Sequence, residues 1–292
     1  EAKIDTAASS AWVSASTNAP ASASGRSELD LATRLPPNCN LGERESMDSG
    51  RHLQSVRAHT VGQCWLDSIR CVLDHGEHYH DEDVGLLEVL GLAVEILKPA
   101  ETDPVIDAHG DKTVVARTFA KFAKGASAPD RPFTYGERIY DMSGVDQFEW
   151  MVDRLRRKPD TKSATIGLLL PGSTSANLPC LTTVDAKIRH ERLDLQFFFR
   201  SQNIFGRQYA NLAALARLQS DLASRCGASP GALRGYVASA HIYAFDLDEA
   251  RRICAGEAIE ISDRYYVSGP RSIRTEPHYL AGEQGTDGLD PI

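Results

Sequence analysis

Cys180 is a residue whose surroundings could support nucleophilic chemistry. It follows Leu178 and Pro179, where a loop meets a predicted β-hairpin. The ordinary interpretation is a half-buried thiol that only packs. A nucleophilic cysteine needs nearby cations that favour the thiolate. Arg200, on the return strand of the same hairpin, could be such a cation, because paired strands bring together residues that are distant in sequence.

Arg200 and Ser201 open a segment that ends at Asn211. This segment could be only a turn followed by a helix start. It could also form an anion site, built from a guanidinium, a hydroxyl and backbone N–H groups. Asn211 could be a plain helix cap, or its amide could read the edge of a base with one donor and one acceptor.

His241 and Tyr243 alternate on a predicted strand, so both side chains face the same side. They could be core residues with satisfied partners, or two groups that contact the hydroxyls of a sugar. Tyr135 and Gly136 form a further pair that could be no more than a turn.

Hydrophobic periodicity and Gly or Pro breakers predict the elements that position these residues. Helices are expected over 62–76, 113–125, 146–160, 211–227 and 246–256, the last with Asp246 as its cap. Strands are expected over 84–97, 163–171 and 235–247, with a hairpin over 180–201 that turns at His190–Glu191. Interleaved helices and strands predict a mixed-sheet α+β or α/β fold.

Length and charge limit the classes of protein that fit. The 292 residues carry 32 Lys+Arg and 40 Asp+Glu, a net charge of −8. This acidic balance argues against a nucleic-acid binder, and no apolar run is long enough for a membrane span. The Ala/Ser-rich start predicts a flexible tail over 1–50, followed by a single domain over 51–292, with ordered structure beginning near residue 60.

Six cysteines are spread thinly along the chain and form no C-x-x-C pair, and the histidines form no H-x-x-x-H pattern. We therefore expect no metal site. Scattered cysteines in a long chain are typical of free thiols in a reducing compartment. With no secretory signal visible, the expected location is the cytoplasm.

Taken in order, these pieces resemble the thymidylate synthase family. The family shows a Tyr-Gly motif, then Pro-Cys before a hairpin, then Arg-Ser, an Asn eleven residues after that Arg, and an Ala-His-Ile-Tyr strand. Here these are Tyr135–Gly136, Pro179–Cys180, Arg200–Ser201, Asn211 and Ala240–Tyr243. The TEPH segment at 275–278 resembles a further family segment. The resemblance implies a mixed β-sheet with flanking helices.

The resemblance also implies a mechanism, in which the Cys180 thiolate adds to C6 of a pyrimidine nucleoside monophosphate. C5 then attacks the methylene group of 5,10-methylenetetrahydrofolate. Arg200 and Ser201 would bind the phosphate, with Arg200 also favouring the thiolate. Tyr135 would assist removal of the C5 proton. The remaining roles would be ring reading by Asn211 and sugar binding by His241 and Tyr243.

The family is a homodimer in which basic residues of the partner subunit complete the phosphate site, and Lys162 matches one residue of the usual arginine pair. Four departures stand out from the family pattern. The second arginine of the pair is Ser163, the early phosphate-binding arginine falls near Asp81 or Glu82, Leu181 follows the nucleophile in place of His, and Asn203 replaces a folate-contacting Asp.

The segment before Tyr135 is shorter than in the family, and no tryptophan lies between Trp65 and Trp150. The catalytic glutamate has no clear counterpart, with Glu95 and Glu101 as the two candidates. Tryptophans in that segment normally shield the one-carbon group from water. Their absence favours hydroxymethyl transfer to C5 over methyl transfer. CMP or dCMP is the favoured substrate, although Asn211 is also the usual residue for reading uracil.

Three hypotheses therefore compete. The first is a folate-dependent C5-hydroxymethylase, with C5-methylation of dUMP or UMP as the alternative reaction. The second is a non-catalytic nucleotide-binding relative, suggested by the missing glutamate and the depleted cations. The third is a structural scaffold in which the motif residues only pack. Retention of the nucleophile together with the base- and sugar-reading residues favours the enzyme.

Overall fold

The structure is a computed structural model that describes residues 52–81, 84–127, 133–170, 172 and 178–257. The Ala/Ser-rich segment over 1–50 and the TEPH segment at 275–278 lie outside these residues. The division into a tail and a single domain over 51–292 therefore stays a prediction. Within the described residues the first strand begins at Gln54, earlier than the expected start near residue 60.

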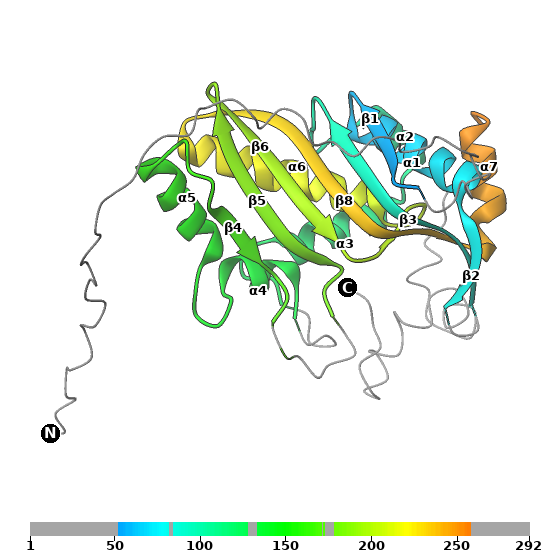
Figure 1. The fold of residues 1–292 in the computed structure, drawn as a ribbon, viewed down its shortest axis with the longest axis horizontal. Helices are drawn as coiled ribbons and strands as arrows, with labels where there is room; N and C mark the ends of the chain where they lie inside the picture. The colour runs from blue at the N-terminus through cyan, green and yellow to red at the C-terminus, as the bar shows by residue number, and fades with distance from the viewer. Residues whose placement is uncertain (1–51, 82–83, 128–132, 171, 173–177, 258–292) are drawn as a thin grey trace, which may run out of the picture. The chain divides into compact units, whose positions relative to one another are not determined.

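An eight-stranded mixed sheet is the centre of the described fold (Figure 1). Its main strand order is β1-β3-β8-β6-β5-β4, while β2 pairs with β3 and β7 pairs with β8. The strands are β1 (Gln54–Ala58), β2 (Glu77–Asp81), β3 (Val84–Ile96), β4 (Ala164–Gly167), β5 (Leu181–Arg189), β6 (Arg192–Phe199), β7 (Gln202–Asn203) and β8 (Ser229–Tyr243). Parallel pairs join β1 to β3, β6 to β8 and β7 to β8. The expected mixed-sheet α+β fold is confirmed.

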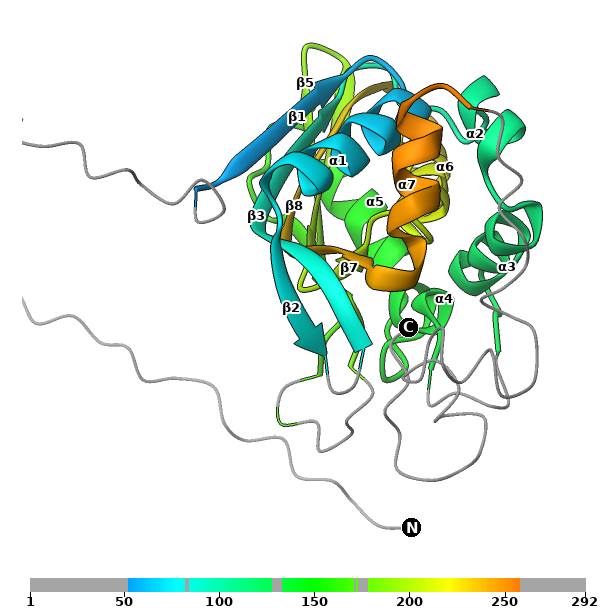
Figure 2. The ribbon, with the colours of Figure 1, turned by 90° about the vertical axis from the view of Figure 1, so that its right-hand side faces the viewer.

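The helices that the structure describes leave one face of the sheet uncovered. They are α1 (Val61–His75), α2 (Pro104–His109), α3 (Lys112–Phe122), α4 (Tyr135–Tyr140), α5 (Gln147–Arg157), α6 (Gln208–Cys226) and α7 (Leu247–Cys254), with a 3₁₀ turn η2 (Ala244–Asp246) before α7. Figure 2 shows α1, α6 and α7 together on one side of the strands. None of the helices in the described ranges is long and apolar enough to cross a bilayer.

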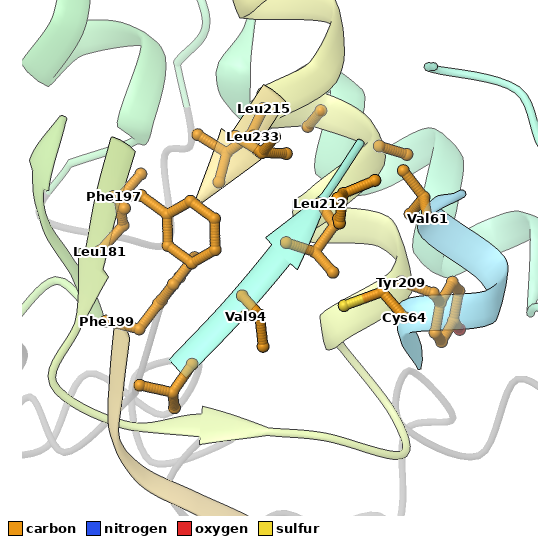
Figure 3. Close-up of a cluster of buried hydrophobic side chains, with 14 of the residues drawn as sticks. Val61, Cys64, Val94, Leu181, Phe197, Phe199, Tyr209, Leu212, Leu215 and Leu233 are labelled. Carbon is orange, nitrogen blue, oxygen red and sulfur yellow. The ribbon is translucent and has the colours of Figure 1, made fainter. Parts of the chain in front are cut away.

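The main core fills the space between the sheet and helices α1 and α6 (Figure 3). Strand β6 shows why, because Leu193, Leu195, Phe197 and Phe199 point inward and alternate with residues of the other face. Helix α6 meets them with apolar side chains that include Leu212. The same period-2 and helical patterns that predicted these elements therefore build the core.

The hairpin of β5 and β6 turns where the sequence predicts. His190 and Glu191 have φ values of 50° and 61°, so both adopt the left-handed region that a tight two-residue turn requires. Gly227, with φ of 69°, ends α6 in the expected way. This hairpin fixes the register that carries Cys180 and Arg200 to the same level of the sheet.

Some boundaries differ from expectation. Helix α3 ends at Phe122, three residues before the predicted Gly125, and the strand predicted over 163–171 is ordered as a strand only over Ala164–Gly167. Tyr135 and Gly136 open α4 instead of forming a turn, because Thr134 and Glu137 make a capping box. Asp246 occupies the N-cap position of α7, but its side chain makes no capping hydrogen bond.

The face of the sheet opposite the helices combines charges with exposed apolar groups. Glu95 on β3 accepts from both Arg57 and Arg234, and Arg234 also donates to Asp194 on β6. Phe198 and Tyr236 are cross-strand partners whose rings stack 5.5 Å apart, and they are 38% and 36% exposed. We call this surface, with Leu90, the open face.

Candidate active site

Cys180 and Arg200 are neighbours across the start of the hairpin. The backbone N–H of Arg200 donates to the carbonyl of Cys180 at 2.8 Å. The Arg200 guanidinium holds the loop before the cysteine, with Nε donating to Pro179 O at 3.1 Å and Nη2 to Leu178 O at 2.8 Å. Its Nη1 makes no hydrogen bond to a described residue, which leaves donors for a bound anion.

Tyr135 lies close to the nucleophile. Its side chain is buried, and its hydroxyl oxygen accepts a hydrogen bond of 3.2 Å from the backbone N–H of Leu181. Burial, with a smaller contribution from Cys180, raises the pKa of Tyr135 well above its usual range. The hydroxyl therefore stays neutral at physiological pH, and its chemistry is that of a hydrogen-bond donor and acceptor and not that of a phenolate.

The other described cysteines are poor nucleophiles. Burial raises the pKa of Cys64 to about 12 and that of Cys71 to about 11. Burial also raises the pKa of Cys226 and of Cys254. Since the thiolate is the reactive form, these four thiols are held protonated at neutral pH. Cys180 remains as the candidate among the five cysteines that the structure describes.

Ser201, His241 and Tyr243 come together beside Arg200. The backbone N–H of Ser239 donates to Arg200 O at 3.2 Å, so β8 runs alongside the end of β6. Ser201 Oγ lies 3.5 Å from His241 Nδ1, and the rings of His241 and Tyr243 are 5.1 Å apart. The expected common face of His241 and Tyr243 is confirmed, and it is the side on which Ser201 lies.

Asn203 forms the turn that leads from β7 into α6. Its Oδ1 accepts from Gly206 N at 2.8 Å, and Ile204 N donates to His241 O at 2.8 Å. Trp65 supports this turn from the buried side, since its indole N–H donates to the carbonyls of Ile204 and Phe205. The turn is thereby held against β8 next to His241.

Asn211 is not a helix cap, which corrects one of the two sequence interpretations. Helix α6 begins at Gln208 with Arg207 at the N-cap position, and Asn211 lies in its first turn. The Asn211 side chain is half-buried and hydrogen-bonds to no described residue. Its amide is thus available for a ligand, directly after the turn formed by Asn203.

A row of polar residues crosses four strands at this level. Direct cross-strand pairing joins Glu77 on β2 to Glu88 on β3, Glu88 to His241 on β8, and His241 to Asn203 on β7. Directly paired residues point to the same face of a sheet. Glu88 is a residue that reasoning from sequence missed. The available signal was a carboxylate inside an apolar strand, but only the register reveals its neighbour.

Lys162 is not part of this cluster within one chain. It is exposed and precedes β4, whose Ala164 pairs with Ala186 and whose Gly167 pairs with Thr183. Lys162 therefore lies at the turn end of the hairpin, roughly 20 Å or more from Cys180 at about 3.3 Å per strand residue. A role for Lys162 at a phosphate requires that it reach the site of another subunit.

The two glutamates suggested from sequence form ion pairs away from Cys180. Glu95 pairs with Arg57 and Arg234 on the open face, and Glu101 pairs with Arg217 on α6. These ion pairs, which the sequence did not show, argue against either residue as the catalytic glutamate. Within the described ranges, no group of three His, Cys, Asp or Glu side chains is placed to hold a metal ion.

The sequence is similar to a known protein family and to several of its members. Residues 112–262 match the pattern of the family described as thymidylate synthase. A Methanosarcina mazei protein named "Putative thymidylate synthase" is 29% identical over 205 residues, which covers 69% of this chain and 94% of that protein. A Methanopyrus kandleri protein of the same name is 30% identical over 204 residues, covering 66% and 95%. The thymidylate synthase of Enterobacteria phage T4 is 28% identical over 142 residues, covering 48% and 50%.

Proposed function

The chain belongs to the thymidylate synthase family, whose members are folate-dependent one-carbon transferases, and we propose on that premise that it hydroxymethylates C5 of a pyrimidine nucleoside monophosphate. The favoured substrates are CMP and dCMP. The observation that carries the proposal is the meeting of Cys180, Arg200, Ser201 and His241 at adjoining strand ends. C5-methylation of dUMP or UMP is the alternative, because Asn211 also suits uracil.

In the proposed reaction the Cys180 thiolate adds to C6 of the ring, which makes C5 a carbon nucleophile. Arg200 fixes the loop that carries the thiol, and its remaining N–H donors take the phosphate together with Ser201. Tyr135 passes on the C5 proton through its neutral hydroxyl. His241 and Tyr243 hold the sugar hydroxyls, and Asn211 reads the ring edge.

5,10-Methylenetetrahydrofolate, the one-carbon donor of the family, supplies the methylene group and, for a methyl product, the hydride. The turn around Asn203 fits such a ligand. Buried amide atoms of Gln202 and Gln208, on either side of this turn, have no hydrogen-bond partner among the described residues. Amides supply both donors and acceptors, which the mixed polar edge of a pterin requires. Asn203, as the neutral replacement of an aspartate, would contact the donor there.

The positions of the tryptophans favour a hydroxymethyl product. Of the two tryptophans in the described residues, Trp65 is fully buried beneath the turn, and Trp150 lies on α5 under the Arg154 guanidinium. Neither therefore supplies an indole to shield the one-carbon group. After loss of the C5 proton and departure of tetrahydrofolate as the leaving group, water would add to the exocyclic methylene at C5, and the bond between Cys180 and C6 would then break to return the thiolate.

We further propose a homodimer formed through the open face. Stacked Phe198 and Tyr236 and the 62% exposed Leu90 give this face apolar contacts of the kind that subunit interfaces bury. Pairing of two such faces would bring Lys162 of one copy toward the phosphate site of the other. The five cysteines in the described residues form no disulfide, which agrees with the proposed location in the reducing cytoplasm.

Release of tritium from C5 tests the proposal. C5-tritiated CMP, dCMP, UMP and dUMP are each incubated with 5,10-methylenetetrahydrofolate, and the product is weighed by mass spectrometry. Tritium release with a hydroxymethyl product supports the proposal, and a methyl product supports the alternative. Nucleotide binding without release from any of the four would favour the non-catalytic relative.

A further inference from the structure

Glu88 is the carboxylate that lies nearest in the sheet to the sugar-binding residues. It pairs directly with His241 across β3 and β8, so the two Cβ atoms are about 5 Å apart on the same face. Its neighbour Leu86 pairs in the same way with Tyr243. Glu88 is therefore the β3 residue that lies beside His241 on the same face of the sheet.

A hydrogen bond from Ser239 fixes the Glu88 carboxylate between the levels of His241 and Arg200. Ser239 Oγ donates to Glu88 Oε1, and the backbone N–H of Ser239 donates to Arg200 O. The carboxylate thus leans along β8 toward the strand position occupied by Arg200, whose N–H in turn bonds to Cys180 O. Its second oxygen, Oε2, makes no hydrogen bond to a described residue and can accept one from a ligand.

The charge of Glu88 restricts what that ligand group can be. A carboxylate repels a phosphate and can only accept hydrogen bonds. The neutral donors of a nucleotide that lie beside His241 and Tyr243 are the hydroxyls of its sugar. A ribose presents two adjacent hydroxyls, whereas a 2′-deoxyribose presents one. Acidic side chains read the ribose 2′-hydroxyl in this way in dinucleotide-binding folds.

We propose that Glu88 is a specificity-determining residue that accepts a hydrogen bond from the 2′-hydroxyl and makes the enzyme prefer ribonucleotides, CMP above dCMP or UMP above dUMP. The proposal rests on the proposed function, in which His241 and Tyr243 bind the sugar. A site built to accept from a hydroxyl discriminates strongly against the analogue that lacks it, because the acceptor is then left without its partner.

The test compares kcat/KM for the ribo and deoxy forms of the preferred base in three proteins. Wild type should favour the ribonucleotide about tenfold or more. Glu88→Ala should lower kcat/KM for the ribonucleotide about tenfold or more and change the deoxynucleotide less than about threefold. Glu77→Ala, which removes the exposed carboxylate paired on the other side of Glu88, is the matched control and should keep the wild-type preference.

Equal losses for both sugars in Glu88→Ala would overturn the proposal and give Glu88 a purely structural role. A wild-type preference for the deoxynucleotide would overturn it as well. Calorimetric binding of CMP and dCMP to the same three proteins gives a readout that needs no turnover. If no nucleotide releases C5 tritium, the proposed reaction fails, but a ribose preference in binding that Glu88→Ala removes would still support the role of Glu88.

Discussion

The hydroxyl oxygen of Tyr135 accepts a hydrogen bond of 3.2 Å from the backbone N–H of Leu181, the residue that follows Cys180. One buried tyrosine therefore fixes the backbone at the nucleophile and keeps a neutral hydroxyl close to this residue. Helix α4 holds it there, since Tyr135 is the first residue after the Thr134 cap. The same oxygen therefore supports the backbone and, in the proposed reaction, relays the C5 proton.

Replacement of this hydroxyl, Tyr135→Phe, should lower both stability and turnover. The buried Leu181 N–H would lose its acceptor, which costs about 1–3 kcal/mol of the free energy of unfolding. Loss of the proton relay should lower kcat about 100-fold or more. Urea unfolding and tritium release measure the two effects. A variant with normal kcat would contradict the relay, even if its stability fell.

Tyr135 should also make the free energy of unfolding decrease at high pH. The pKa of Tyr135 is raised in the folded state, whereas an unfolded tyrosine titrates near pH 10. The stabilisation is therefore complete below about pH 10 and is lost above it at up to about 1.4 kcal/mol per pH unit. Burial raises the pKa of Tyr140 to about 12, so this residue adds to the slope.

Urea unfolding of wild type and Tyr135→Phe between pH 8 and pH 11 measures this slope, which should be shallower in the variant. Tyr79→Phe removes an exposed hydroxyl of the same kind and serves as the matched control. Identical slopes in wild type and Tyr135→Phe would contradict the prediction, because they would mean that the pKa of Tyr135 is the same in the folded and the unfolded protein.

Removal of the nucleophile, Cys180→Ser, should abolish tritium release while leaving the fold intact. Serine is close in shape to cysteine but is a far weaker nucleophile at neutral pH. Thermal unfolding should stay near the wild-type value because Cys180 lies at a strand end. Cys226→Ser changes a thiol whose pKa burial raises, and it should retain activity. Turnover that survives in Cys180→Ser would refute covalent catalysis.

Subunit complementation tests the partner role of Lys162. Cys180→Ser and Lys162→Ala should each be weakly active or inactive alone. When the two variants are refolded together, half of the dimers contain one of each, and one of the two sites then holds both Cys180 and the partner lysine. Activity should recover to about a quarter of wild type. No recovery would mean that Lys162 acts within its own chain or not at all.

Periodicity and breakers sufficed to predict most of the fold. The helices over α1 and α6 and the hairpin with its turn at His190–Glu191 follow from local patterns that the structure confirms. The end of α3 and the start of α4 could not be predicted as well from the sequence. They depend on caps and on packing against distant segments, which a short window of sequence does not contain.

The candidate site shows the same limit. Cys180, Arg200, Ser201, His241 and Tyr243 were selected from sequence, and the structure brings them to adjoining strand ends. Glu88 was missed because its pairing with His241 is a property of sheet register. The ion pairs of Glu95 with Arg57 and Arg234, which argue against this candidate for the catalytic glutamate, were not predicted because they join residues far apart in the chain.

The central claim is that Cys180 bonds to C6 of the nucleotide, and a trapped adduct tests it most directly. A 5-fluoro nucleotide carries fluorine where the C5 proton must leave, so the reaction should stop with the ring attached to the enzyme. Intact-protein mass spectrometry with 5-fluoro-CMP and 5-fluoro-UMP, each with 5,10-methylenetetrahydrofolate, should show a stable adduct that peptide mapping places on Cys180. Full occupancy of the site by either nucleotide with no adduct on Cys180 would contradict the account.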